Sequence, residues 1–310
     1  MGITSIQAIQ NANTTFEAAF QKLFAGGPQG FARQFTQIVP NKAKALNIPV
    51  VSAFPRFREW VGAKQYLEPK AYSFSLTTTK FEASIEVPRF DVEYDLTGAV
   101  GSMLSNFVAS SEFWLDDVMI TKFLANPTAY DGSALLSATR SWSTGNVDNL
   151  EAAALTFALY QTARKSMRLN TDERGKPLGV KPTHLLVGPT LERIGMEVTG
   201  SDRPVTLSTA GGMDAGASVQ AAVTLSNYIG GDVSLMVSDY ITGNQWAVMD
   251  LSKPGLRPLI YSEAAPPHAI YSTDLAGESR MNRDVFLYSI EADGVAGAGL
   301  PQLIHGSVTA

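Results

Sequence analysis

The chain of 310 residues has no cysteine, only three histidines and few charged side chains. Without cysteine it can form no disulfide and no thiolate metal site, and it has no cysteine nucleophile. Charged residues make up 17% of the chain, against about 25% in an average globular protein. Because a monomer normally relies on surface charge for solubility, this low fraction indicates that much of the surface meets other protein chains.

Long apolar runs are missing as well. No stretch reaches about 18 consecutive apolar residues, so no membrane span is predicted. The segment 1–24 lacks the basic start and apolar block of a signal peptide. The cytoplasm is therefore the expected compartment of the newly made chain.

The usual signatures of catalytic and cofactor sites are also absent from the sequence. No HExxH spacing, GxSxG elbow or GxxxxGK[ST] loop occurs. The glycine-rich stretch 294–299 is expected to be a turn, not a phosphate loop. The three histidines are too far apart to share one helix or strand; they are His184, His268 and His305. We therefore expect no enzymatic activity, no cofactor and no metal.

Charge is unevenly distributed along the chain. The net charge is −5, which argues against a dedicated nucleic-acid reader. The first 60 residues nevertheless carry six basic side chains and two glutamates, so the remaining residues are strongly acidic. A basic arm on an acidic body suits contact with a neighbouring acidic subunit or loose contact with phosphate. Ordinary scatter of surface charge is the alternative interpretation.

The N-terminal segment 1–55 is predicted to be an extended arm that carries one helix. Apolar residues recur on one helical face over residues 5–24, and Gly26-Gly27-Pro28 ends the pattern. No sustained period follows up to residue 55. We expect the apolar face of this helix to need a surface outside the arm.

Two strands are predicted next, and they are expected to form one ribbon within residues 56–90. Apolar and polar residues alternate over 72–77 and again over 81–87, as in a strand with one buried face. Because a two-stranded ribbon alone is marginally stable in water, its apolar face must dock on the chain or on a partner.

The strongest helical pattern covers residues 92–125. Its apolar stripe predicts one helix about 45 Å long, with Asp95 as the N-cap and Asn126-Pro127 at its end. A helix of this length is expected to be a backbone on which other elements pack.

Shorter elements follow. Asp148 and Glu151 resemble a capping box for a helix that reaches Met167, and residues 184–187 are predicted to be a buried strand. A short helix starts at Pro189, and residues 199–220 are expected to be a loop. Further strands are predicted at 233–237, 246–249, 256–261 and 285–290. The mixed order indicates an α+β fold in two lobes joined by the long helix.

This element order resembles that of the major capsid protein of tailed bacteriophages, which has the HK-97-type fold. The resemblance implies five segments: an N-terminal arm (1–55), an E-loop β-ribbon (56–90), a P-domain spine helix with its connection (91–148), an A-domain (149–262) and closing strands (263–310).

More specifically, the sequence is similar to the Mu-type major head subunit family. The residues that carry the similarity are Phe54-Pro55-Arg56-Phe57-Arg58-Glu59-Trp60-Val61-Gly62, Lys80-Phe81-Glu82, Ile85-Glu86-Val87-Pro88-Arg89 and Tyr130-Asp131-Gly132. The chain departs from the family pattern at residues 133–140, where that family usually has an aromatic pair and an Asp-His-Pro element.

Membership of this family would imply a homo-oligomer of hexamers and pentamers that closes into an icosahedral head around double-stranded DNA. Contact with DNA is expected to be weak and non-specific. A separate scaffold, a portal and decoration proteins are the other expected partners. The chain would reside in the virion capsid after assembly in the cytoplasm of a bacterial host.

The ribbon would then lie across a neighbouring subunit. The predicted assembly contacts are Arg56, Arg58, Glu59, Trp60, Lys80, Glu82, Glu86 and Arg89, with Trp60 as an apolar anchor. Burial of Trp60 in the core of its own chain is the alternative. Two other functions are consistent with the sequence: an encapsulin-like compartment that encloses a cargo protein, and a soluble α+β enzyme.

Overall fold

The computed structural model describes residues 5–24, 30–51, 71–95, 98–142, 145–171, 175, 177–200, 202–206, 222–226, 230–253, 255–272 and 283–309. The chain divides into two compact units. The first comprises Met1–Ile48, Phe74–Ile120 and Ile260–Gly297, and the second comprises Pro49–Ser73, Thr121–Leu259 and Ala298–Ala310. Each unit is thus built from three separate stretches, whereas the sequence predicted consecutive segments.

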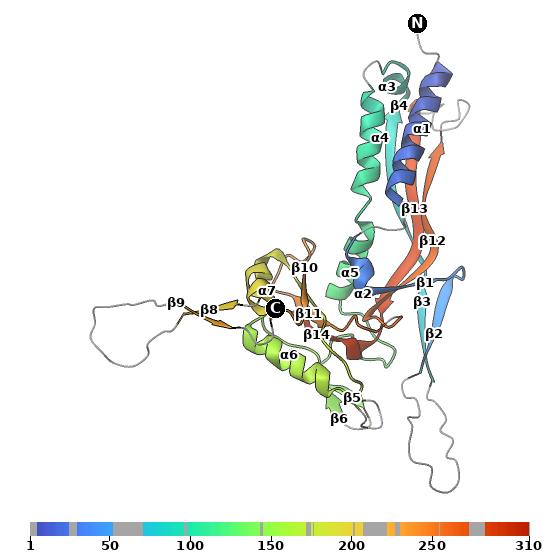
Figure 1. Ribbon diagram of the computed structural model, residues 1–310. Helices are drawn as coiled ribbons and strands as arrows, with labels where there is room; N and C mark the ends of the chain where they lie inside the picture. Colours follow the sequence, from blue (N-terminus) through green and yellow to red (C-terminus); the bar gives the residue numbers. More distant parts are fainter. Residues whose placement is uncertain are drawn as a thin grey trace. The chain divides into compact units, whose positions relative to one another are not determined.

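A four-stranded sheet forms the centre of the first unit (Figure 1). Its strands, in spatial order, are β1 (Thr36–Pro40), β12 (Leu259–Ser272), β13 (Val285–Ala298) and β4 (Thr79–Pro88). β4 pairs antiparallel with β13 along its whole length, from Pro88 opposite Val285 to Thr79 opposite Gly294. Exposure alternates along β4, which confirms the predicted period of two.

Two helices, α1 (Ser5–Phe24) and α4 (Ala99–Ser110), run alongside the long strands (Figure 1). The N-terminal helix has the predicted bounds, but it packs on its own chain. Phe16 is fully buried, with its ring 6.2 Å from that of Phe107 and 5.2 Å from that of Tyr288. The helix does bury its apolar face on a surface outside the arm, as expected. That surface belongs to the same chain.

The predicted ribbon is wrong in its pairing. β3 (Ala71–Thr77) forms a two-stranded sheet with β2 (Ala45–Val51), although β4 begins only two residues after β3 ends. Alternation of apolar residues fixes which face of a strand is buried, but it does not select the neighbouring strand.

The predicted long helix is broken into α4 and α5 (Trp114–Leu124) by a turn at residues 111–113. The hydroxyls of Ser110 and Ser111 both donate to the carbonyl of Phe107, at 2.7 and 3.4 Å. Serine side chains that bind the backbone in this way compete with the helical ladder. The break therefore occurs where two consecutive serines interrupt the apolar stripe.

The N-cap of α4 is Gly98, not Asp95 as predicted, but the Asp95 side chain still binds the first turn of the helix. Its carboxylate accepts hydrogen bonds from the backbone N–H groups of Ala99 (3.1 Å) and Val100 (2.9 Å). The helix begins later than expected, because Gly98 takes a left-handed conformation (φ 75°) directly before it. A residue with a side chain would be strained at that position.

The second unit contains another four-stranded sheet. Its strands, in spatial order, are β10 (Ser234–Val237), β7 (His184–Val187), β11 (Trp246–Met249) and β14 (Ile304–Ser307). β7 is parallel to β10 and antiparallel to β11. Two helices, α6 (Phe157–Leu169) and α7 (Glu192–Thr199), share one apolar cluster with this sheet. The strand at 184–187 and the helix after Pro189 are thereby confirmed.

The start of α6 differs from the prediction. Thr156 is the N-cap, and its hydroxyl accepts a hydrogen bond from the N–H of Leu159 (3.2 Å). Asp148 instead closes a local turn by accepting from the N–H of Leu150 (3.1 Å). The capping box predicted from Asp148 and Glu151 is therefore wrong.

The glycine-rich stretch near the C-terminus is largely strand, not turn, since β13 continues to Ala298. A Cβ atom at Gly294 would overlap the hydroxyl oxygen of Tyr261 and would lie 2.7 Å from the carbonyl oxygen of Ser262. Glycine is needed here because the neighbouring strand approaches closely.

The remaining elements are α2 (Ala32–Phe35), α3 (Arg89–Glu93), β5 (Arg140–Trp142), β6 (Gly145–Val147), η1 (Pro189–Leu191), β8 (Asp202–Thr206), β9 (Ala222–Ser226) and η2 (Pro301–Leu303).

Candidate assembly surfaces

The predicted contact residues fall into two groups. Four of them lie outside the described residues: Arg56, Arg58, Glu59 and Trp60. The other four are Lys80, Glu82, Glu86 and Arg89, which stand on β4 and at the first residue of α3. Only the second group can be placed in the fold.

Lys80 and Glu82 are exposed on the face of β4 opposite its half-buried apolar residues. On the neighbouring strand β13, Asp293 stands opposite Lys80 and Glu291 stands opposite Glu82. Opposite charges placed across two strands attract each other, whereas like charges repel. This outward face is therefore a mixed charged surface with an acidic excess, suited to polar contacts with another chain.

Glu86 and Arg89 are instead paired within their own unit. Arg283 binds Glu86 at 2.6 Å, and Arg89 lies 3.3 Å from Asp284 and 3.4 Å from Glu93. The N–H of Arg89 also donates to the carbonyl of Asp284 (3.0 Å). These contacts tie the junction of β4 and α3 to the start of β13.

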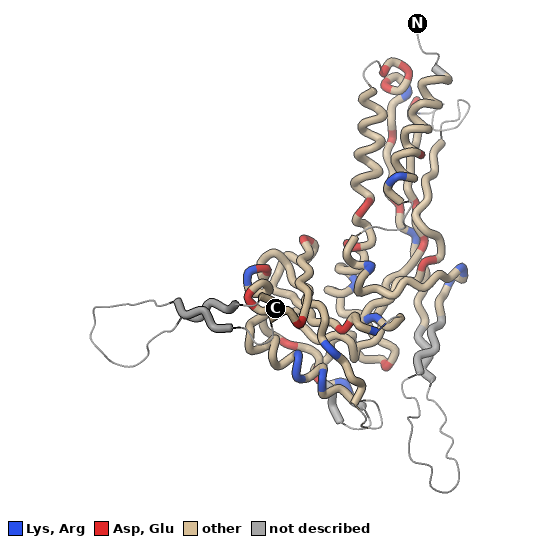
Figure 2. The backbone as a smooth tube through the Cα atoms, in the orientation of Figure 1, with Lys and Arg blue, Asp and Glu red and all other residues tan. Residues whose placement is uncertain are grey.

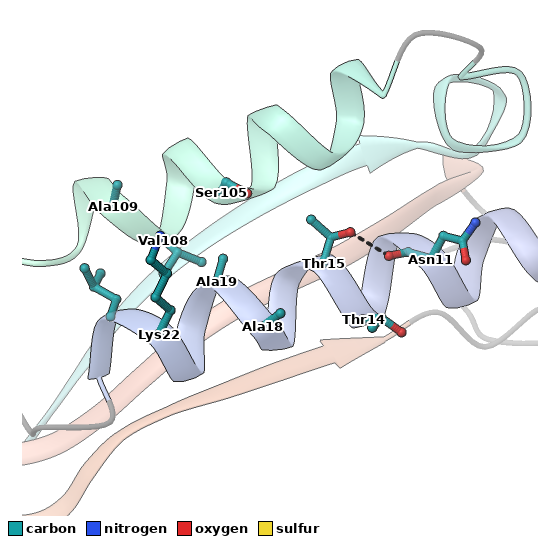
Figure 3. Close-up of a pocket in the computed structure, with 10 residues that line it drawn as sticks. Asn11, Thr14, Thr15, Ala18, Ala19, Lys22, Ser105, Val108 and Ala109 are labelled. Atoms are coloured by element: carbon teal, nitrogen blue, oxygen red, sulfur yellow. Dashed lines mark hydrogen bonds between the residues drawn. The ribbon is translucent and has the colours of Figure 1, made fainter.

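A groove of about 730 Å³ lies between α1 and α4 (Figure 3). Most of its lining side chains are small, such as those of Ala18, Ala19 and Ala109, and Lys22 stands at one end. The hydroxyl of Thr15 is bound to the carbonyl of Asn11 (2.8 Å). The groove thus lacks the converging polar groups that a catalytic pocket needs.

Two aromatic rings are exposed at α3, one within the helix and one on its C-cap residue. Phe90 and Tyr94 are each 65% exposed, and their ring centroids are 4.5 Å apart. Adjacent exposed aromatic rings are typical of protein contact surfaces.

Buried polar groups in both units hold structure together. The Asp116 carboxylate accepts hydrogen bonds from the backbone of α2, and burial raises the pKa of this carboxyl. In the second unit, His305 lies 3.2 Å from Glu151, and burial lowers the pKa of its imidazole, although Glu151 opposes this.

Among the described residues, no group of three or more potential metal ligands occurs. None of the described helices is long and apolar enough to cross a membrane.

Arg140 is a structural residue that the sequence did not reveal. Its side chain is 1% exposed, and it forms an ion pair with Asp131. It also donates to the carbonyls of Ala134 and Leu135. The guanidinium thereby fixes the segment in which the chain departs from the family pattern. A single arginine in a turn-rich stretch has no periodic signal that would predict its burial.

Comparisons with known proteins agree with this architecture. The family model described as Mu-like prophage major head subunit gpT matches residues 9–153, 149–241 and 216–310. No curated protein matches the chain.

Solved structures with a similar fold include bacteriophage capsids and a virus-like particle. The procapsid of bacteriophage JBD30 has 20% identity and a TM-score of 0.54, with 96% of this chain and 74% of that chain covered. The mature capsid of bacteriophage PhiM1 has 12% identity and a TM-score of 0.53, with coverages of 90% and 86%. A virus-like particle from Pyrococcus furiosus has 8% identity and a TM-score of 0.52, with coverages of 96% and 98%.

These structural likenesses confirm the predicted α+β capsid fold of the HK-97 type. The three ranges of the family match together cover nearly the whole chain, including both compact units. The chain therefore belongs to the Mu-like prophage major head subunit family, and it is a structural protein of the virion capsid, not an enzyme.

Proposed function

We propose that copies of this chain form hexamers and pentamers that close into an icosahedral shell around double-stranded DNA. The observation that carries the proposal is the two-stranded sheet of β2 and β3, which has no third strand among the described residues. Because such a ribbon is marginally stable alone, a neighbouring subunit is the natural surface for it. The low fraction of charged residues in the chain supports extensive subunit contacts.

The two compact units correspond, in this proposal, to the P-domain and the A-domain. The first unit would be the P-domain, with α1 as part of its core, and the second would be the A-domain. The β2–β3 ribbon and the residues between its strands would be the E-loop. This assignment replaces the consecutive segments expected from the sequence.

The proposed subunit contacts are Lys80 and Glu82 on β4 together with Arg56, Arg58, Glu59 and Trp60. The exposure of the first two supports this role. Glu86 and Arg89 would act indirectly, because their ion pairs shape the junction from which α3 begins. A separate scaffold protein and a portal are the further partners that we propose, and a decoration protein is another candidate.

The proposal is tested by negative-stain microscopy and light scattering on the purified chain, alone and with a candidate scaffold protein. Closed particles, or rings of five or six subunits, would support it. A stable monomer under both conditions would contradict it. The nature of the contents separates a viral head from an encapsulin-like compartment, since the particles would contain nucleic acid in the first case and a cargo protein in the second.

The Trp60→Ala variant tests the ribbon itself. We expect it to keep the circular dichroism spectrum of the wild type and to lose closed particles. The matched control is Phe113→Ala, which also removes an aromatic side chain, 48% exposed, from a different part of the chain. If both variants assemble normally, the ribbon does not anchor the shell through Trp60.

A further inference from the structure

The helix α6 has an unusual charge for this chain. Its thirteen residues include Arg164, Lys165 and Arg168 but no aspartate or glutamate, whereas the whole chain has a net charge of −5. It is the most basic of the described helices. Figure 2 shows these Lys and Arg positions along α6 in blue.

The basic side chains lie on the face of α6 that points away from the core. The opposite face is buried through Tyr160, Ala163 and Met167. Lys165 and Arg168 are exposed, and no described carboxylate forms an ion pair with either of them. Only Arg164 is paired, with Asp232. The outer face of α6 therefore carries two cations that are not neutralised within the described chain.

A further cation lies beyond the C-terminal end of α6. The ammonium of Lys253 binds the carbonyl of Leu178 (3.0 Å), and the N–H of Leu178 binds the carbonyl of Asn170 (2.9 Å), the residue directly after the helix. Positive charge thus continues past the end of the helix. A helix C-terminus favours nearby cations. That effect is confined to the last turn of the helix, so it does not explain the presence of Lys165.

We propose that the outer face of α6 is the surface that meets the phosphate backbone of the packaged DNA. This inference rests on the proposed function, since it needs a shell that contains DNA. From Lys165 to Arg168 the helix rises about 4.5 Å, which spans one or two phosphates of a strand at about 3.4 Å each. A few exposed cations provide weak binding without sequence preference, because each contacts phosphate and none reads a base.

The binding of DNA by α6 is tested first on subunits that are not closed into shells. Fluorescence anisotropy with a labelled DNA duplex of mixed sequence gives the affinity at about 50 mM and about 200 mM salt. We expect the variant Lys165→Gln/Arg168→Gln to bind about tenfold more weakly at the lower salt, with the salt slope reduced by about 2. Single-stranded RNA of the same length is the second probe, and tight binding to it without binding to the duplex would overturn the proposal.

The matched control is Lys42→Gln/Lys44→Gln. It removes the same charge from two exposed lysines between β1 and β2. We expect this control to keep the wild-type salt slope. An equal loss in both variants would mean that net charge alone sets the affinity, and the assignment to α6 would then be wrong.

The direction in which α6 faces is tested on closed particles. We expect a small amine-reactive reagent that enters the shell to modify Lys165. A large polymeric amine-reactive reagent that stays outside should leave Lys165 unmodified. Mass spectrometry detects the modification. Modification by the large reagent places α6 outside, and protection from both reagents places it in a subunit contact; either result overturns this inference. Failure to form particles would instead contradict the proposed function.

Discussion

The carboxylate of Asp116 in α5 accepts a hydrogen bond from the backbone N–H of Ala32 at 2.9 Å, and a second from Phe31 at 3.3 Å. It thereby holds the first turn of α2, which precedes it by more than eighty residues. Gly30, directly before this turn, has a φ of 105°, and a Cβ there would lie 2.6 Å from Cγ of Asp116. The carboxylate and the glycine therefore fit together as one contact within the first unit.

Removal of this carboxylate should weaken the fold. We expect Asp116→Ala to lower the free energy of unfolding by about 1 to 3 kcal/mol, because two N–H groups lose their acceptor. The neighbouring, exposed Asp117 gives the control Asp117→Ala, for which a change below about 0.5 kcal/mol is expected. Urea denaturation of both variants measures the difference, and equal values would contradict the role of Asp116.

The pKa of Asp116 predicts a pH dependence. Burial raises this pKa above the ordinary value of 3.8, against the effect of the two backbone hydrogen bonds. The folded state therefore binds the proton more readily than the unfolded state. The resulting stabilisation is complete below the ordinary pKa and is lost as the pH rises through the raised one.

Asp116→Asn cannot titrate at this position, so it is the reference for that effect. The stability of the wild type relative to this variant should fall as the pH rises from the ordinary pKa of 3.8 through the raised one. Urea denaturation across this range measures the change. A constant difference, or one that grows with pH, would show that the carboxyl does not titrate in this way.

Two glycine substitutions should have opposite effects on stability. We expect Gly294→Ala to cost about 1 to 3 kcal/mol, because its Cβ would overlap the buried Tyr261 in a packed interior. Gly101 lies inside α4, where a Cβ would meet Thr15 at an ordinary 3.5 Å. Gly101→Ala should therefore stabilise the chain by about 0.5 to 1 kcal/mol. Thermal unfolding distinguishes them, and a destabilised Gly101→Ala would contradict the packing described for α4.

The buried Arg140 should be sensitive to loss of its charge. Arg140→Met would remove a donor from the Asp131 carboxylate and from the carbonyl of Ala134, whereas the carbonyl of Leu135 keeps its hydrogen bond from Asn149. We expect a loss of about 3 to 5 kcal/mol, because the buried ion pair is broken. The double variant Arg140→Met/Asp131→Ala should lose less than the sum of the single changes, because the carboxylate is then absent. Additive losses in urea denaturation would show that the two side chains are not coupled.

The docking of the N-terminal helix can be tested in the same way. Phe16→Ala should cost about 3 to 5 kcal/mol, since the fully buried ring packs on Phe107 and Tyr288. The control is Ile6→Ala on the same helix, where the side chain is 57% exposed. If Phe16→Ala were as stable as this control, α1 would not belong to the core of the first unit.

Much of the local structure could be predicted from the sequence. The period of apolar residues predicted α1 and the alternation along β4, because each depends on residues a few positions apart. The same reasoning predicted one helix over residues 95–125, since the apolar stripe continues past the two serines that break it. Their hydrogen bonds to Phe107 are a local competition that periodicity does not measure.

The surroundings of the candidate contact residues were predicted only in part. The sequence placed Lys80, Glu82, Glu86 and Arg89 on or next to a half-buried strand, and they are there. It did not predict that Glu86 and Arg89 pair with Arg283 and Asp284. Those partners are almost 200 positions away, and no spacing rule connects them.

The sequence by itself determined the α+β class, the amphipathic N-terminal helix and the family, because these depend on composition, period and short motifs. Only the tertiary structure decided that this helix is core, that β3 pairs with β2 while β4 pairs with β13, and that Arg140 is buried. The physical reason is the same in each case. Pairing and burial are set by contacts between residues distant in the sequence, and a local pattern shows that a face must be covered without showing what covers it.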